Sequence, residues 1–337
     1  MQRTRSIVQT TLILLALTLS APIAAQRHAK QKEKEKAANL PAVIWRDPGD
    51  VATLNLIYGA GGKEHAPDPN AKYTFLKEDL KQTSPKFDIE DDHGMRWRIK
   101  LGQEPQSETA ATRLLWAVGY FTREAYYLAE VKVTGLPKLH RGQSFVSPDG
   151  TVHRARLERR AKEVKVLGDW DWFNNPFLGT KEFNGLRVMM ALMNNWDLSN
   201  PNNSVYEVDG ERRYLARDVG ATFGSTGNSI TRSKSVLKDY VKSKFIEKVT
   251  PDYVDFVMHS RPFFLTVFNV PNYRERTRWE QITKHIPRAD AKWLGQRLAR
   301  LSEEQIRDCF RTSGYTPEEV EGYAKAVQKR IAELNAL

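Results

Sequence analysis

Residues 194–220, NNWDLSNPNNSVYEVDGERRYLARDVG, contain the most informative arrangement in the chain. Asp197 follows an apolar segment with helical spacing, and Asn202 lies five residues further on. The Asp-Gly pair at 209–210 predicts a tight turn between strands at 204–208 and 212–217. The returning strand therefore ends at Asp218 of an Asp-x-Gly sequence, and we expect the hairpin to bring Asp218 close to Asp197 and Asn202.

Two carboxylates and an amide oxygen in one place form a hard-oxygen ligand set that suits Mg²⁺ or Mn²⁺. We predict Asn202 and Asp218 as metal ligands. Asp197, left free of metal, is the candidate for accepting a proton from an attacking hydroxyl. Turn formation is the alternative, because Asn-rich stretches and Asp-Gly pairs are common in turns. That alternative explains each residue singly and leaves their order unexplained.

A predicted hairpin lies upstream, with strands at 86–89 and 95–101 around the polar turn 91–94. In its second strand, apolar residues alternate with Arg96, Arg98 and Lys100, so Lys100 is expected to face away from the core side.

A helix is predicted next, from Pro105 in its first turn to a stop at Gly119. Glu108 falls on the apolar stripe of this helix, where a carboxylate needs a partner, and Lys100 is the nearest candidate in sequence. The alternative is that Glu108 is a first-turn acid favoured by the helix dipole and that Lys100 is solvated.

Further strands are predicted at 51–58, 125–133 and 152–157, and a helix at 183–193. The C-terminal third reads as helical, with N-cap signatures at Ser302 and Thr316. The single cysteine, Cys309, excludes an internal disulfide and is expected to be buried between C-terminal helices.

The N-terminus carries the pattern of a secretory signal peptide over residues 1–25: two arginines, a short apolar run and small residues at 23–25. A retained membrane anchor is the alternative, although the run is shorter than the roughly 20 residues that a span needs. Residues 26–40 read as a charged flexible tether, with 27–36 capable of weak contact with the cell envelope. We predict export to the periplasm or the extracellular space, with no integral membrane segment after cleavage.

The net charge of +11 on 337 residues is concentrated at the start of the chain. Residues 1–25 contribute two positive charges and residues 26–36 a net three, so the remainder carries only six. This small surplus gives no support to nucleic-acid binding.

The order of these motifs resembles the protein-kinase-like superfamily, particularly its divergent secreted, spore-coat and HipA-type branches. The family pattern is a strand Lys, a helix Glu, an Asp-x-x-x-x-Asn loop, a short hairpin and an Asp-x-Gly. The resemblance implies an α+β, bilobal fold, with a β-rich N-lobe containing one helix over 41–160 and a mainly helical C-lobe over 161–337.

The resemblance also implies roles for particular residues. Lys100, oriented by Glu108, would contact ATP phosphates; Asn202 and Asp218 would hold Mg²⁺ or Mn²⁺; and Asp197 would be catalytic. Gly59, Gly61 and Gly62 are candidates for a phosphate-covering loop, with a plain turn as the alternative. Asn195-Trp196-Asp197 replaces the usual His-Arg-Asp, so control by activation-loop phosphorylation is not expected.

The predicted function is a secreted phosphotransferase that moves the ATP γ-phosphate to a hydroxyl of a protein, lipid or small molecule. Two alternatives remain: a nucleotide-binding pseudokinase, and a cell-envelope interaction protein without catalysis. Export favours these alternatives, since ATP is scarce outside the cytoplasm. A glycosidase built on Asp169 and Asp171 beside tryptophans is a remote fourth possibility.

Overall fold

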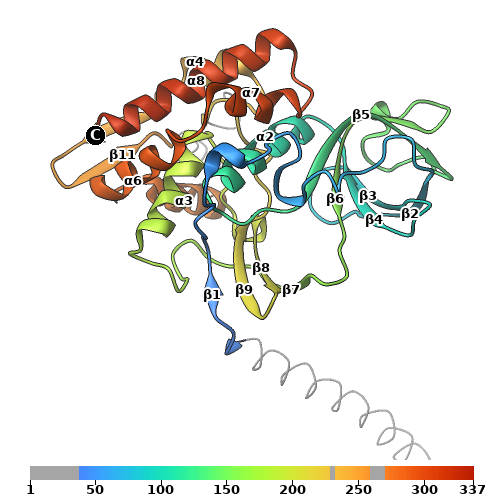
Figure 1. Ribbon diagram of the computed structural model, residues 1–337, viewed down its shortest axis with the longest axis horizontal. Helices are drawn as coiled ribbons and strands as arrows, with labels where there is room; N and C mark the ends of the chain where they lie inside the picture. The colour runs from blue at the N-terminus through green and yellow to red at the C-terminus, as the bar shows by residue number, and fades with distance from the viewer. Residues whose placement is uncertain (1–37, 228–231, 259–269) are drawn as a thin grey trace, which may run out of the picture.

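The computed structural model describes residues 38–227, 232–258 and 270–337. The predicted signal peptide and most of the predicted tether lie outside the described residues. Figure 1 shows a β-barrel on one side of the molecule and most of the helices on the other, with helix α2 (Glu104–Ala117) between them. The predicted α+β class, with a β-rich N-lobe and a mainly helical C-lobe, is confirmed by this arrangement.

The N-lobe is a closed barrel with the strand order β2-β3-β4-β6-β5. Alternating residues fill its interior, among them Phe87, Ile89, Trp97 and Ile99, which are at most 3% exposed. The predicted hairpin and the two later strands are all present. The strands are β2 (Tyr73–Glu78), β3 (Lys86–Glu90), β4 (Arg96–Lys100), β5 (Ala125–Thr134) and β6 (Thr151–Arg159).

Helix α2 follows β4 directly, with Pro105 in its first turn. The chain leaves the helix through Gly119 at φ 98°, a conformation that favours glycine. Ala110, Ala111, Leu114 and Leu115 are buried in the same core cluster as the C-lobe. The helix therefore joins the two lobes, and its first turn lies next to the end of β4.

The C-lobe contains the predicted hairpin, formed by β8 and β9 with Asn203 opposite Ala216. A four-stranded sheet of order β1-β9-β8-β7 contains it, and a small three-stranded sheet, which the sequence did not indicate, lies among the helices. The strands of these sheets are β1 (Ala42–Val43), β7 (Lys165–Gly168), β8 (Asn203–Val208), β9 (Glu211–Ala216), β10 (Ile246–Val249), β11 (Tyr253–Phe256) and β12 (Ile286–Pro287).

The helices of the C-lobe surround a single core. The two predicted N-caps are confirmed, since Ser302 and Thr316 both form capping boxes. Cys309 is fully buried in α7, as expected. The helices are α3 (Lys181–Leu192), α4 (Leu237–Lys242), α5 (Val270–Glu280), α6 (Arg288–Leu298), α7 (Glu303–Arg311) and α8 (Pro317–Asn335).

The prediction of a strand over 51–58 is wrong. Val51–Thr53 form a 3-10 turn, because the Asp50 carboxylate accepts a hydrogen bond from the Ala52 amide and caps it. Apolar residues in this segment, with those near β1, pack into the C-lobe core, and β1 pairs in parallel with β9. Residues 42–56, which the sequence placed in the N-lobe, thus contact the C-lobe.

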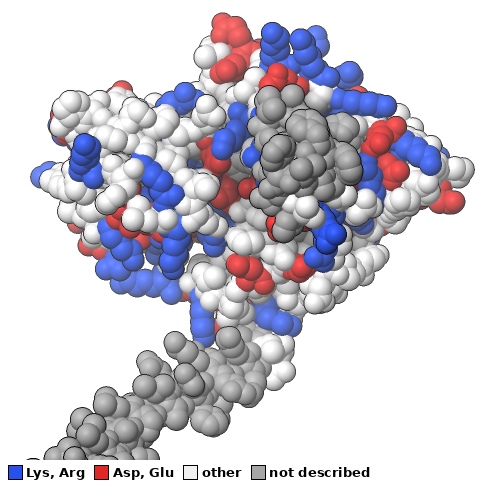
Figure 2. Space-filling view, turned by 180° about the vertical axis from the view of Figure 1, so that it is seen from behind, with Lys and Arg blue, Asp and Glu red and all other residues white. Residues whose placement is uncertain are grey.

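Surface charge is mixed over most of the face in Figure 2, with Lys and Arg gathered along the lower edge of the barrel side, at the left of the view. Among the described residues, none of the helices has both the length and the apolar character needed to cross a membrane.

Candidate active site

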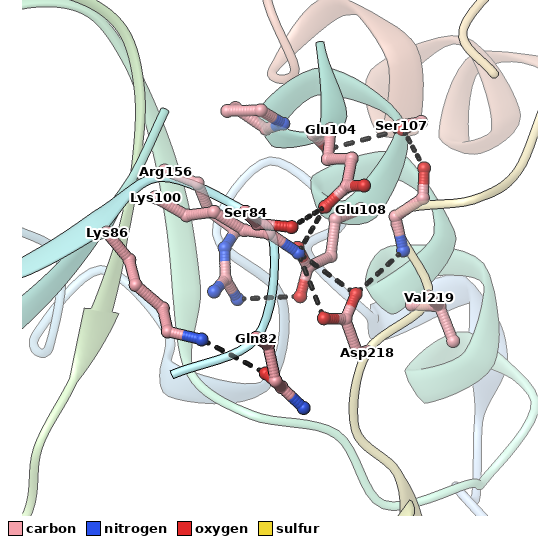
Figure 3. Close-up of polar contacts among 12 residues, drawn as sticks. Gln82, Ser84, Lys86, Lys100, Glu104, Ser107, Glu108, Arg156, Asp218 and Val219 are labelled. Atoms are coloured by element: carbon pink, nitrogen blue, oxygen red, sulfur yellow. Dashed lines mark hydrogen bonds and ion pairs between the residues drawn. The ribbon is translucent and has the colours of Figure 1, made fainter. Parts of the chain in front are cut away.

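Lys100 is at the centre of a buried ionic cluster (Figure 3). Its ammonium nitrogen lies 2.9 Å from Glu108 Oε2, 2.6 Å from Glu104 Oε2 and 2.9 Å from Asp218 Oδ1. The side chain is only 4% exposed. The predicted partnership of Lys100 with Glu108 is therefore present, and the alternative of a solvated Lys100 is wrong. Lys100 does point away from the barrel interior, into the space that α2 and Asp218 enclose.

The electrostatics of the cluster hold Lys100 as a cation. Burial alone would lower its pKa, but the negative charges of Asp218, Glu108 and Glu104 outweigh burial and raise the pKa of Lys100. Burial also opposes ionisation of Asp218, yet Lys100 holds the Asp218 pKa well below its usual range. The Glu108 carboxyl is fully buried, and burial raises its pKa.

Glu104 is a member of the cluster that sequence reasoning missed. It lies one helical turn before Glu108 on the same face of α2. Lys234 lies 2.5 Å from Glu104 Oε1, and the Ser84 hydroxyl donates to Oε2 at 2.9 Å. The i, i+4 spacing of the two glutamates was the signal that could have identified it.

Arg156 is the second missed member. Its Nη1 lies 3.0 Å from Glu108 Oε1 and its Nη2 lies 3.3 Å from Glu158 Oε2. With Arg156 and Lys234, the cluster contains three cations, which balance the carboxylates of Glu104, Glu108 and Asp218. This balance explains how so many charges are tolerated in a buried place.

The loop that carries Asp197 is connected to Asp218 through Asn202. The Asn202 side-chain amide donates a hydrogen bond to the Asp197 backbone carbonyl at 3.0 Å. The backbone carbonyl of Asn202 accepts hydrogen bonds from the backbone amides of Arg217 and Asp218 at 2.7 and 2.9 Å. The hairpin thus brings the three residues into one hydrogen-bonded unit, as its geometry predicted. Within the part of the chain that the structure describes, the Asp197 carboxylate and Asn202 Oδ1 have no hydrogen-bonding partner.

Arg330 of α8 supports this loop from behind. Its buried guanidinium donates to Leu192 O at 2.7 Å and to Asn194 Oδ1 at 2.9 Å, at the end of α3. A further bond at 2.7 Å reaches the Ser243 hydroxyl. Asn194 has φ 55°, which asparagine tolerates better than most residues. The C-terminal helix therefore fixes the turn that leads into Asp197.

Gly59, Gly61 and Gly62, the candidates for a phosphate-covering loop, have no contact with the Lys100 cluster among those that a side chain at each position would meet. Gly59–Gly61 form a 3-10 turn in which Gly59 packs against Arg113 and Gly61 against Tyr126. Arg113 is five residues after Glu108, about 140° around the helix, so this turn contacts a different face of α2. The close packing accounts for the glycines, and the plain-turn alternative fits them better than a phosphate-covering loop.

The connection between β2 and β3, residues 79–85, takes the position next to the cluster instead. Ser84 bonds to Glu104, and the Pro85 carbonyl accepts from the Leu101 amide at 3.0 Å. Figure 3 shows Gln82 and Lys86 beside Lys100, joined by a 3.0 Å hydrogen bond. This role could not be predicted from a glycine pattern, because residues 79–85 contain no glycine.

A cavity of about 480 Å³ lies between the lobes, and one of its lining residues, Glu158, pairs with Arg156 of the cluster. Its apolar lining comes from both lobes and includes Leu76 of β2, Phe121, and Val166, Tyr206 and Leu215 of the C-lobe sheet. Its basic lining includes Lys77, Arg96, Arg160, Lys162 and Arg213. Strand β4 runs from Arg96 to Lys100, and β9 leads from Leu215 to Asp218, so both connect this cavity with the cluster. A cavity of this size accommodates a small-molecule ligand.

The donor set fits a divalent cation. Glu104, Glu108 and Asp218 each offer one oxygen, and these atoms lie within 4.8 Å of one another. Asp218 and Glu104 are partly exposed, whereas Glu108 is closed off by Lys100 and Arg156. Asn202 offers a further oxygen, Oδ1, which has no partner among the described residues. Its backbone carbonyl accepts a hydrogen bond from the Asp218 amide. Hard oxygen donors of this kind suit Mg²⁺ or Mn²⁺.

The aromatic pair beside Asp171 has a structural role. Trp170 and Trp172 are in the core at 4% and 3% exposure, so neither offers a face to a sugar. Asp171 accepts hydrogen bonds from the Phe173 amide and from Asn200 in the loop after Asp197. The glycosidase alternative is therefore not supported.

A β-rich lobe, one helix that pairs its Glu with a strand Lys, and a hairpin ending in Asp-x-Gly together define a protein-kinase-like fold. Two solved structures are similar to this chain. One is the Helicobacter pylori proinflammatory kinase CtkA, with 10% identity over 78% of this chain and 96% of that chain and a TM-score of 0.43. The other is the golgi casein kinase, with 9% identity over 77% and 74% and a TM-score of 0.32. No family model and no curated protein sequence matches the chain.

Proposed function

We propose that this protein is an exported kinase-like phosphotransferase that moves the γ-phosphate of ATP to a hydroxyl acceptor with Mg²⁺ or Mn²⁺. The observation that carries the proposal is the joining of Lys100, Glu108 and Asp218 in one buried cluster, from three separate elements. A structural ion pair needs only two of these residues, whereas nucleotide binding uses all three.

ATP would extend along the line from the cavity to the cluster. The base would lie between Leu76 of the N-lobe and the C-lobe residues Tyr206 and Leu215, where the lining is apolar. The phosphates would lie near Lys100 and Asp218, under the 79–85 connection. We base this direction on the metal, because Asp218, Asn202 and Glu104 would hold the divalent cation that the phosphates require.

Lys100 is saturated in the structure, since its three N–H groups face three carboxylates. With Asp218 engaged by a divalent cation, Lys100 would have a donor free for a phosphate oxygen. Glu108 would keep its ion pairs with Lys100 and Arg156 and so hold the ammonium in place. Asn202 and Asp218 would hold the metal, with Glu104 as a further oxygen donor. The bound metal supplies charge neutralisation at the phosphates.

In the transfer step, the acceptor oxygen forms a bond to the γ-phosphorus while the bond from that phosphorus to the β,γ-bridging oxygen breaks. ADP carries away the electron pair, and the acceptor proton passes to the Asp197 carboxylate. That carboxylate is suited to the role because it has no hydrogen-bonding partner among the described residues. Asn202 positions it by bonding the Asp197 carbonyl.

Export is part of the proposal and rests on residues 1–25, whose charge, apolar run and small residues match a signal peptide. The acceptor would then be a molecule of the periplasm or the cell exterior, and ATP would have to reach that compartment.

A thermal-shift titration of the mature protein with ATP and Mg²⁺ or Mn²⁺ tests nucleotide binding. We expect the wild type to be stabilised by about 3 kcal/mol at a hundredfold excess over Kd. Asp218→Ala should lose the stabilisation, and Asp197→Ala should keep it. No stabilisation of the wild type at millimolar nucleotide would contradict the proposal.

A nucleotide-binding pseudokinase is the second candidate, and the saturation of Lys100 by three carboxylates favours it. Release of γ-phosphate label from ATP, in the presence and absence of candidate acceptors, separates the two. An enzyme shows release that falls about 10²- to 10⁴-fold in Asp197→Ala. A pseudokinase shows binding without any release that depends on Asp197.

A further inference from the structure

Arg217 is a half-buried cation directly before Asp218 in the sequence. Its backbone is fixed, because its amide donates to the Asn202 carbonyl at 2.7 Å. Within residues 38–227, 232–258 and 270–337, no side chain or carbonyl forms a hydrogen bond or ion pair with its guanidinium. A cation withdrawn from water without an anionic partner is destabilising, so its presence calls for an explanation.

The neighbouring cations of the cleft differ from Arg217 in this respect. Arg98 is paired with Asp88 at 2.8 Å, and Arg123 donates to Glu158 and to the Tyr206 hydroxyl. Arg156 and Lys100 are paired within the cluster. Among these cations, Arg217 therefore stands out because no described residue forms a direct hydrogen bond or ion pair with its guanidinium.

The position of Arg217 follows from β9. Arg213 and Leu215 of β9 line the cavity, and Arg217 follows the last residue of this strand, Ala216. Burial lowers the pKa of Arg217, the charge of Arg123 lowers it further, and Tyr206, Glu158 and Asp218 act in the opposite sense. Arg217 stands in the chain between Leu215, which lines the cavity, and Asp218, which belongs to the cluster, so its backbone lies between the two.

This inference rests on the proposed function. The order of base, ribose and phosphates in a nucleotide then indicates which anionic group would pair with Arg217. With the base in the cavity and the metal-bound phosphates at Asp218, the ribose and the α-phosphate occupy the space between. The α-phosphate is the charged group of that part. We infer that Arg217 binds the α-phosphate of the nucleotide from the C-lobe side, and so positions a phosphate that is not transferred.

Adenosine and AMP are the probes that isolate this contact, because they differ by the α-phosphate alone. Dissociation constants for both are measured by calorimetry with the mature wild type, Arg217→Gln, Arg217→Lys and Arg212→Gln. Arg212 is the matched control, since it removes the same charge from β9 on the opposite side, where its side chain bonds the Leu40 carbonyl.

We expect the wild type and Arg212→Gln to bind AMP more tightly than adenosine. Arg217→Gln should lose about 10- to 100-fold in AMP affinity, the range for a charge-assisted hydrogen bond, and keep its adenosine affinity. Arg217→Lys should lie between, because it keeps the charge without the forked donors. Melting temperatures without ligand should not fall in Arg217→Gln.

Two results would overturn the inference. If the wild type binds adenosine and AMP and Arg217→Gln keeps the same affinity ratio, Arg217 does not contact the phosphate, and the proposed function is unaffected. If Arg217→Gln weakens adenosine and AMP equally, its role is in the shape of the site. A wild type that binds neither adenosine, AMP nor metal–ATP contradicts the proposed function itself.

Discussion

The Lys100 ammonium lies 2.9 and 3.1 Å from the two carboxylate oxygens of Asp218, across 118 residues of sequence. This contact joins the last residue of an N-lobe strand to the end of the C-lobe hairpin. Since both side chains also belong to the candidate catalytic machinery, the geometry of the site and the relation between the lobes depend on each other.

Lys100→Met should destabilise the protein by about 3–5 kcal/mol, because it leaves Glu104, Glu108 and Asp218 facing one another in a buried place. Addition of Glu108→Gln should recover part of that loss, giving a coupling energy of about 1–3 kcal/mol. Urea unfolding of the two single variants and the double variant measures this cycle. Strict additivity would show that the residues do not interact energetically.

Glu104→Gln should weaken Mn²⁺ binding by roughly tenfold, since it removes one negative charge close to the cation while keeping the hydrogen-bonding shape. Asp218→Asn should abolish binding within the same concentration range. Glu130→Gln, on the exposed side of β5, is the control for net charge and should bind as the wild type does. Calorimetry with the metal alone gives the three affinities, and equal affinities for wild type and Glu104→Gln would remove Glu104 from the ligand set.

Glu158 predicts a pH dependence of stability. Burial alone would raise its pKa, but Arg123, Arg156 and Arg160 outweigh burial and lower it to about 2. Its stabilising contribution, about 3 kcal/mol, is complete above the unfolded carboxyl's pKa of about 4.3 and is lost as the pH falls toward 2. Unfolding of wild type and Glu158→Gln should therefore differ most at pH 7 and converge in acid. The more exposed Glu90→Gln should change little at any pH.

Arg330→Met should cost about 2–4 kcal/mol of stability, because the Ala191 and Leu192 carbonyls at the end of α3 lose their buried donor. Turnover should fall further than the loss of folded protein explains, since the turn before Asp197 loosens. Arg307→Met, which removes exposed ion pairs on the outer side of α7, is expected to change stability little. Activity normalised to the folded fraction, with chemical unfolding, gives both quantities; normal specific activity in Arg330→Met would refute the supporting role.

The elements that could be predicted from the sequence depend on residues that lie close together in the chain. The hairpins at 86–100 and 203–216 and the helix after Lys100 follow from alternation, turn residues and capping. The partnership of Lys100 and Glu108 could also be predicted, since one buried carboxylate on a helix needs a cation and few lie near in sequence.

Long-range packing accounts for what could not be predicted. The apolar run at 51–58 reads equally well as a strand, and its 3-10 turn depends on Gln305, whose side chain donates to Val51 O and Leu54 O. The sequence leaves Gly59, Gly61 and Gly62 open to two interpretations, a phosphate-covering loop or a plain turn, whereas in the structure Arg113 and Tyr126 leave no room for a side chain at Gly59 and Gly61. Arg156 and Arg217 have no local pattern, because their surroundings come from distant strands.

The bonds of Arg330 also determine when the site can form during synthesis of the chain. Asn194 and Arg330 are 136 residues apart, and the turn before Asp197 lacks its donor until α8 has been made. The loop that carries Asp197 is thus completed only after nearly all of the described residues have left the ribosome. A protein that is threaded through a membrane as an unfolded chain would carry this site across in an unassembled, inactive form.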